Sequence, residues 1–100
     1  MLNKLTNVIQ TNKDRLHELK ISAEEVKSSE LNFKDEAEQV DLFSETAMAR
    51  ITLFKSNRLY IQILNIESGE SIYFFDDFMD DGINIGEFIM EAIFKMKEGI

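Results

Sequence analysis

The sequence predicts an α+β domain in which an antiparallel β-meander of about four strands is flanked by an N-terminal and a C-terminal helix. Residues 46–75, TAMARITLFKSNRLYIQILNIESGESIYFF, hold three apolar runs separated by two tight-turn signals, and a meander joins such runs with short connections. Apolar residues recur at helical spacing on both sides of this region, in residues 2–20 and 85–96. A chain of 100 residues suits a single domain, 1–100, with one modest core.

The first turn, Lys55-Ser56-Asn57, sets the register of the central hairpin. A three-residue loop needs a left-handed residue at its end, and asparagine tolerates this conformation better than most residues. The apolar pairs that follow on one face are Leu53–Leu59, Ile51–Ile61 and Ala49–Ile63. A two-residue loop would slip the register by one and place these side chains opposite polar ones, so we favour the longer loop.

The second turn, Glu67-Ser68-Gly69, fits the same loop type because glycine adopts positive φ without steric cost. This loop pairs Ile66 with Glu70 and brings Tyr73 and Phe75 onto the core face. The other sheet face is half polar, and its apolar members are Tyr60, Leu64, Ile66, Ile72 and Phe74. Either the N-terminal helix covers that face or the face binds a partner.

Upstream of the meander the pattern predicts helices and short extended pieces. An amphipathic helix over residues 2–20 has a weak point in its apolar stripe at Asn12. Ser22-x-x-Glu25 has the form of a capping box and predicts a short helix over residues 23–29. Alternation in residues 31–33 predicts a brief extended piece.

Residues 39–43 predict an edge strand that enters the meander through a turn at Ser44-Glu45. This turn places four apolar residues on the core face through the pairs Leu42–Ala47 and Val40–Ala49. Beyond the meander, the acidic segment DDFMDDG, residues 76–82, is predicted to form a loop.

The C-terminal helix has the clearest local signals. Asn84 is a good N-cap, and Glu87 three residues later can complete a capping box. The apolar stripe of this helix, which we expect to pack on the core face of the sheet, comprises Ile85, Phe88, Ile89, Ala92, Ile93 and Met96.

The chain is acidic, with a formal net charge of −8 and a pI of about 4.6. Nucleic-acid binding depends on Lys and Arg neutralising phosphates, so we expect no direct contact with nucleic acid. Residues 59–94 contain no Lys or Arg, and their acidic members are Glu67, Glu70, Asp76, Asp77, Asp80, Asp81, Glu87 and Glu91. A field of one sign suits a basic partner, although a solvated surface is the commoner reason for an acidic run.

Nothing in the sequence indicates catalysis. The single histidine, His17, lacks a motif that would position a partner for acid–base work, and an ordinary helical histidine explains it better. The segment from Asp77 to Glu87 has the wrong spacing for a calcium loop, because it puts Met79 at a ligand position. No nucleophile elbow, Walker loop or dinucleotide motif is present, so we expect no enzyme, no cofactor and no metal site.

The chain has no cysteine, no apolar leader and no apolar run of membrane-spanning length. We therefore expect a cytoplasmic protein that does not associate with membranes. Some of the side chains that we expect at the surface are of the kinds enriched at interface centres. These are Tyr60 and Phe74 on the second sheet face and Phe78 and Met79 in the acidic loop.

Residues 39–77 resemble the immunity proteins of the TriTu family. That family's pattern has a strand ending in a bulky aromatic residue, a tight turn, a strand ending in an I-E-T-G-E-like turn, and then an aromatic strand. The matching residues here are Ile51-Thr52-Leu53-Phe54, Ile66-Glu67-Ser68-Gly69-Glu70 and Tyr73-Phe74-Phe75. The chain departs from the pattern at Phe54, where the family has Trp, and at Ser56-Asn57, which replaces a Ser-Gly-like turn.

The resemblance implies a CdiI-type immunity protein of contact-dependent growth inhibition. Its partner would be the cognate CdiA C-terminal toxin domain, a nuclease acting on transfer RNA, with elongation factor Tu reached through the toxin. An acidic inhibitor can occupy the basic cleft of a nuclease, and the toxin-binding residues that we predict on this ground are Glu67, Glu70, Asp76, Asp77, Phe78, Asp80, Asp81 and Tyr60. Two alternatives remain, a small acidic secretion chaperone and a DNA-mimicking inhibitor, although the charges are too clustered to imitate a regular phosphate ladder.

Overall fold

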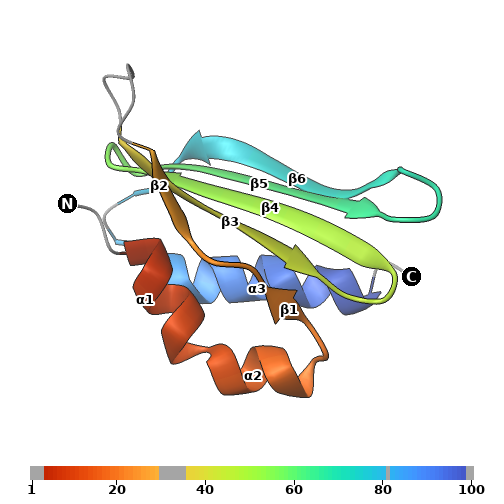
Figure 1. Ribbon diagram of the computed structural model, residues 1–100. Helices are drawn as coiled ribbons and strands as arrows, with labels where there is room; N and C mark the ends of the chain where they lie inside the picture. Colours follow the sequence, from red (N-terminus) through yellow and green to blue (C-terminus); the bar gives the residue numbers. More distant parts are fainter. Residues whose placement is uncertain (1–3, 30–35, 81, 99–100) are drawn as a thin grey trace.

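The computed structural model describes residues 4–29, 36–80 and 82–98, which form one antiparallel sheet with helices on one side (Figure 1). In chain order the elements are α1 (Lys4–Thr11), α2 (Lys13–Glu18), β1 (Ser22–Ala23), β2 (Lys27–Ser29), β3 (Ala37–Phe43), β4 (Ala47–Phe54), β5 (Arg58–Asn65), β6 (Ser71–Phe78) and α3 (Ile85–Glu98). The strand order is β1-β3-β4-β5-β6, and β2 also pairs with β3. The predicted α+β fold, a meander with flanking helices, is therefore confirmed.

The central hairpin has the predicted register. Its core-face pairs are Leu53–Leu59, Ile51–Ile61 and Ala49–Ile63. Asn57 has a φ of 72° and Gly69 a φ of 74°, so each turn contains the left-handed residue that its sequence predicts. One asparagine and one glycine thus help to align β4, β5 and β6 so that Ile51, Leu53, Leu59, Ile61 and Ile63 share the core face.

The β5–β6 turn is one residue longer than predicted. Asn65, rather than Ile66, lies opposite Glu70, and the Asn65 N–H donates to the Glu70 carbonyl over 2.9 Å. The Asn65 side-chain oxygen accepts two further N–H groups of the turn, at 3.0 and 2.9 Å, which stabilises the extra residue. A bulge at Ile72 then restores the register, so that the predicted core-face pairs form as Ile63–Tyr73 and Ile61–Phe75.

The β3–β4 turn also differs from the prediction. The Ser44 hydroxyl accepts the Ala47 N–H over 3.0 Å, and the Ser44 N–H donates to the Ala47 carbonyl over 2.9 Å, so the turn is centred on residues 45–46. The register shifts by two, and the pairs are Leu42–Ala49 and Val40–Ile51 instead of the predicted Leu42–Ala47 and Val40–Ala49. Because a shift of two keeps each side chain on its face, all four predicted core residues are still buried.

Residues 23–29 do not form the predicted helix. They contribute to β1 and β2, which pair along the outer side of β3, so β3 is not the predicted edge strand (Figure 1). Lys20, with a φ of 59°, reverses the chain after α2, and the Glu24 N–H then donates to the Asp41 carbonyl over 2.9 Å. Pairing with an open strand edge outweighs the weak local helix signal. The predicted extended piece at residues 31–33 lies outside the described residues.

The N-terminal amphipathic pattern forms two helices that meet at Asn12. The Asn12 side-chain amide donates to the Val8 carbonyl over 2.9 Å and so competes with the helical backbone. Asn12 itself has non-helical angles, φ −103° and ψ 15°. The break falls at the weak point of the apolar stripe and allows Leu5 of α1 and Leu16 of α2 to enter one core.

A buried carboxylate, Glu38 of β3, caps α1 from the sheet. Glu38 is only 1% exposed. Its two carboxylate oxygens accept the Leu5 N–H over 3.1 Å, the Thr6 N–H over 3.3 Å and the Thr6 hydroxyl. The first N–H groups of a helix lack helical acceptors and carry positive partial charge, so this carboxylate both satisfies and attracts them.

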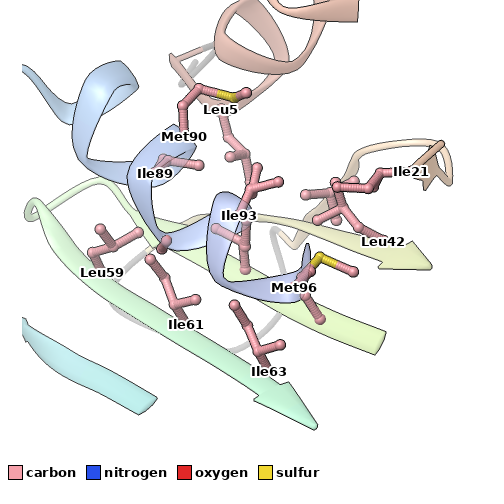
Figure 2. Packing of buried hydrophobic residues seen from close by; sticks show 14 of the residues in the cluster. Leu5, Ile21, Leu42, Leu59, Ile61, Ile63, Ile89, Met90, Ile93 and Met96 are labelled. Carbon is pink, nitrogen blue, oxygen red and sulfur yellow. The ribbon is translucent and has the colours of Figure 1, made fainter. Parts of the chain in front are cut away.

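The core lies between α3 and the sheet (Figure 2). The Asn84 side chain accepts the Glu87 N–H over 3.1 Å, which confirms the predicted N-cap. The predicted stripe of α3 joins the same cluster as Ile51, Leu53, Ile61 and Ile63, and Met90, on the neighbouring side of α3, is buried as well.

The acidic segment is not wholly a loop, because β6 continues through Phe78. Arg58 of β5 holds Asp76 in the strand, and the Met79 N–H donates to the Asn57 carbonyl over 2.8 Å. Met79 is 6% exposed, so its predicted exposure in an acidic loop is wrong. Arg58 on the neighbouring strand thus pairs with one of the two aspartates, Asp76, and the other, Asp77, accepts the Phe78 N–H over 2.8 Å.

Candidate functional site

The sheet has one covered face and one open face. All three helices lie on the same side of the sheet (Figure 1), and the core cluster joins Leu5 and Leu16 to α3. The alternative in which the N-terminal helix covers the second face is therefore wrong. We call that second face the open face, and its members on the three long strands are Met48, Arg50, Thr52, Phe54, Arg58, Tyr60, Gln62, Leu64, Phe74, Asp76 and Phe78.

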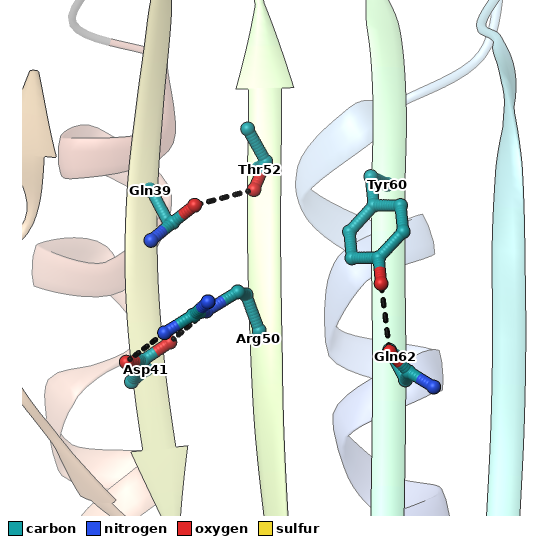
Figure 3. A network of polar contacts seen from close by, with 6 residues as sticks. All are labelled: Gln39, Asp41, Arg50, Thr52, Tyr60 and Gln62. Atoms are coloured by element: carbon teal, nitrogen blue, oxygen red, sulfur yellow. Dashed lines mark hydrogen bonds and ion pairs between the residues drawn. The ribbon is translucent and has the colours of Figure 1, made fainter. Parts of the chain in front are cut away.

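Half of the open face is a set of polar pairs over β3, β4 and β5 (Figure 3). Arg50 donates two hydrogen bonds to the Asp41 carboxylate, over 2.9 and 3.1 Å. The Thr52 hydroxyl donates to Gln39 over 3.2 Å, and the Tyr60 hydroxyl donates to Gln62 over 2.7 Å. The hydrogen bonds from Arg50 lower the pKa of Asp41 below its ordinary value. These pairs neutralise the charge of this half of the face.

The other half of the open face, over β5 and β6, is aromatic. Tyr60 and Phe74 meet edge to face with ring centroids 5.6 Å apart. Phe74 is 55% exposed and Phe78 62% exposed. The Arg58 guanidinium lies 5.7 Å from the centroid of the Phe54 ring. Exposed aromatic rings beside an arginine are the composition of a protein-binding centre.

Arg58 forms the second bidentate ion pair of the open face. Its Nε and Nη2 donate to the two Asp76 oxygens, both over 2.9 Å. These hydrogen bonds lower the pKa of Asp76. Asp76 therefore keeps its negative charge, and the Arg58 guanidinium beside it balances that charge at the surface.

The predicted toxin-binding residues fall into two groups at opposite ends of β6 and a third between them. Glu67 and Glu70 are exposed in the β5–β6 turn. Asp77 and Asp80 are exposed at the far end, about 24 Å from the turn at roughly 3.4 Å per residue of strand. The open face brings together the three others that are described, Tyr60, Asp76 and Phe78. Asp81 lies outside the described residues.

Sequence reasoning missed the role of Arg58 and of Glu38. The Arg58–Asp76 pair spans neighbouring strands, and the register would have predicted it if β6 had been extended by three residues. Glu38 occupies an inward position of β3, where a carboxylate signals a specific buried partner. A single charged residue that interrupts an apolar alternation could thus have indicated the role of Glu38.

The remaining surface offers shallow hollows. One of about 240 Å³ lies on the open face beside Arg50, Tyr60 and Leu64. Another, of about 350 Å³, separates α1 from the start of α3, and a third, of about 460 Å³, lies beside exposed His17. Within residues 4–29, 36–80 and 82–98 no group of three or more His, Asp or Glu side chains is placed to hold a metal ion. No described helix has the length and apolar character needed to cross a membrane.

Comparison with known proteins gives one match. Searches of curated proteins and of solved structures found none. A family model described as "Immunity protein TriTu" matches residues 3–90, which include α1, α2, the whole sheet and the start of α3. Immunity proteins generally are not enzymes, and an immunity function implies a cognate toxin as binding partner. The chain therefore belongs to the TriTu family of immunity proteins.

Proposed function

We propose that this immunity protein neutralises the CdiA C-terminal nuclease domain of a contact-dependent growth inhibition system. The toxin domain cleaves transfer RNA and engages elongation factor Tu, and the immunity protein meets it in the cytoplasm. The observation that carries the proposal is the stretch of residues 59–94, which has eight acidic residues and no Lys or Arg.

The physical link between this charge and the function is the toxin's own substrate. A nuclease must hold phosphates in a basic cleft, and an acidic protein can fill the same cleft. Opposite fields also steer two proteins together and raise the association rate. Inhibition then requires only that the inhibitor binds the cleft faster and more tightly than RNA does.

The contact that we propose runs along β6. The carboxylates at its ends, Glu67 and Glu70 on one side and Asp77 and Asp80 on the other, supply charge. Tyr60 and Phe78, on the open face near the Asp77 and Asp80 end, supply apolar anchors. Charges at the rim of an interface mainly set the association rate, whereas desolvated aromatic rings at its centre mainly set the dissociation rate.

Affinity purification of the tagged protein from its native strain tests the partner. At both low and high salt, mass spectrometry is expected to identify a basic toxin fragment in a one-to-one complex. Elongation factor Tu in the same complex would support the finer assignment. A stable dimer holding an unfolded secreted client would contradict the proposal and favour the chaperone alternative.

Charge reversal tests the acidic contact with that recovered toxin domain. Two double variants, Glu67→Lys with Glu70→Lys and Asp80→Lys with Asp81→Lys, are expected to slow association at least about tenfold at low salt. Asp14→Lys with Glu18→Lys is the matched control, because both residues are exposed on α2, on the covered side of the sheet. If both double variants associate like the control, the acidic-occlusion mechanism is wrong.

A further inference from the structure

The two edges of the sheet differ in their strand pairing. The outer edge of β3 is paired with β1 and β2. At the other end of the strand order stands β6, which in the described part of the chain pairs only with β5. It is eight residues long, so one whole side of its backbone faces outward (Figure 1).

The register identifies the backbone groups on that outward side. In an antiparallel pair, hydrogen-bonded and non-hydrogen-bonded positions alternate. The Met79 N–H donates to the Asn57 carbonyl over 2.8 Å, so the inward positions of β6 are Asp77, Phe75 and Tyr73. The N–H and C=O groups that point away from β5 therefore belong to Phe74, Asp76 and Phe78. The Phe78 N–H donates to the Asp77 carboxylate over 2.8 Å, so the donors for an added strand are the N–H groups of Phe74 and Asp76.

This edge carries few of the features that usually prevent strand addition. Natural edge strands carry charged residues, especially lysines, or prolines, bulges or a covering element, and the charged residues of β6 are Asp76 and Asp77. β6 has no lysine or proline, and its bulge at Ile72 lies at one end, so residues 73–78 keep a regular register. The charge of Asp76 is matched by Arg58 on the neighbouring strand. Phe74 and Phe78, at two of the outward positions, carry rings that are 55% and 62% exposed.

The charges around the edge indicate what it accepts. Glu67 and Glu70 flank one end, Asp77 and Asp80 flank the other, and no basic residue lies between residues 59 and 94. We propose that the β6 edge binds an extended, Lys- or Arg-bearing segment of the toxin domain as an added strand. Main-chain hydrogen bonds to the N–H groups of Phe74 and Asp76 and to the outward carbonyl groups hold this segment. Its apolar side chains cover Phe74 and Phe78, and its basic side chains meet the terminal carboxylates. This inference rests on the proposed function and names the contact by which it acts.

Amide hydrogen exchange measured by NMR tests the added strand directly. The labelled protein is compared alone and with the toxin domain recovered in the purification. The outward amides of Phe74 and Asp76 are expected to exchange quickly in the free protein and at least about tenfold more slowly in the complex. The inward amides of Tyr73, Phe75 and Asp77 are expected to be protected in both states and serve as the internal control.

A proline substitution provides an independent readout. Phe74→Pro removes an outward N–H but no bond to β5, so the fold should persist while toxin affinity falls at least about tenfold. Phe74→Ala removes the ring but keeps the N–H, and it should cost less affinity than the proline. Equal losses in the two variants would leave only a side-chain contact and overturn strand addition.

The outcomes separate this inference from the proposed function. Tight toxin binding without slower exchange at residues 74 and 76 would overturn the added strand and leave the immunity function standing. Failure of the tagged protein to bind any toxin domain would remove both. Protection that appears at high protein concentration without toxin would assign the edge to a second copy of the chain, and this result also contradicts the proposal.

Discussion

The covered and open faces of the sheet use alternate residues of the same strands, yet they are built on different physical principles. On the covered face, Ile51, Leu53, Ile61 and Ile63 are fully buried under α3. On the open face, their neighbours along the chain form side-chain hydrogen bonds, including two bidentate arginine–aspartate pairs. Stability and the proposed toxin binding are therefore expected to be separable, since a residue's place in the alternation decides which face of the sheet it occupies.

The largest effect is expected on the covered face. Ile89→Asp places a charge without a partner where α3 meets the sheet, and it should destabilise the domain by about 3–5 kcal/mol. Urea unfolding measures the change. Glu91→Asp introduces the same side chain at an exposed position of α3 and should change stability by less than about 0.5 kcal/mol. If Ile89→Asp melts within a few degrees of wild type, the placement of α3 is wrong.

An intermediate effect is expected where a polar group enters the covered face. Glu38→Ala leaves the first N–H groups of α1 without their acceptor and should cost about 1–3 kcal/mol. Glu38→Gln retains one acceptor oxygen and should cost less. Glu45→Ala, in the exposed β3–β4 turn, is the control. Equal unfolding free energies for Glu38→Ala and this control would show that the carboxylate does not support α1.

The smallest effect is expected on the open face. Asp41→Asn weakens an exposed ion pair and should cost less than about 1 kcal/mol. The lowered pKa of Asp41 means that the folded state binds its proton less readily than the unfolded state does. The pair's contribution is therefore fully present above the ordinary carboxylate pKa, near about 4, and is lost as pH falls through the lowered value. Unfolding measured between neutral and strongly acidic pH should show a shallower acid loss in Asp41→Asn than in wild type.

Sequence reasoning succeeded where local chemistry decides the structure. Asn57 and the alternation around it predicted the central register, and Asn84 predicted the start of α3. It failed where distant residues decide. The helix predicted at residues 23–29 gave way to pairing with β3, and the loop predicted at residues 76–82 gave way partly to a strand that Arg58 stabilises. The Ser44 hydroxyl, which accepts the Ala47 N–H, stabilises a turn that shifts one register by two residues.

For the binding site, the sequence predicted the exposed aromatic rings but not their grouping. Tyr60 and Phe78 were predicted to contact the toxin, and the meander brings them together with Phe74. The acidic residues were predicted as one surface, but β6 separates them into two ends. The separation was not predicted because the sequence analysis ended the last strand too early. The ion pair between Arg58 and Asp76 lies in the part of β6 that it left out.

The dissociation constant of the toxin complex, measured by calorimetry, tests most directly whether the open face binds the toxin. Phe78→Ala on the open face should weaken binding at least about tenfold and leave the melting temperature nearly unchanged. Phe94→Ala, which removes a partly exposed ring of α3 on the covered side, should leave the dissociation constant within about twofold. The reverse ranking, with toxin binding lost in Phe94→Ala and kept in Phe78→Ala, would assign binding to the helices and contradict the account.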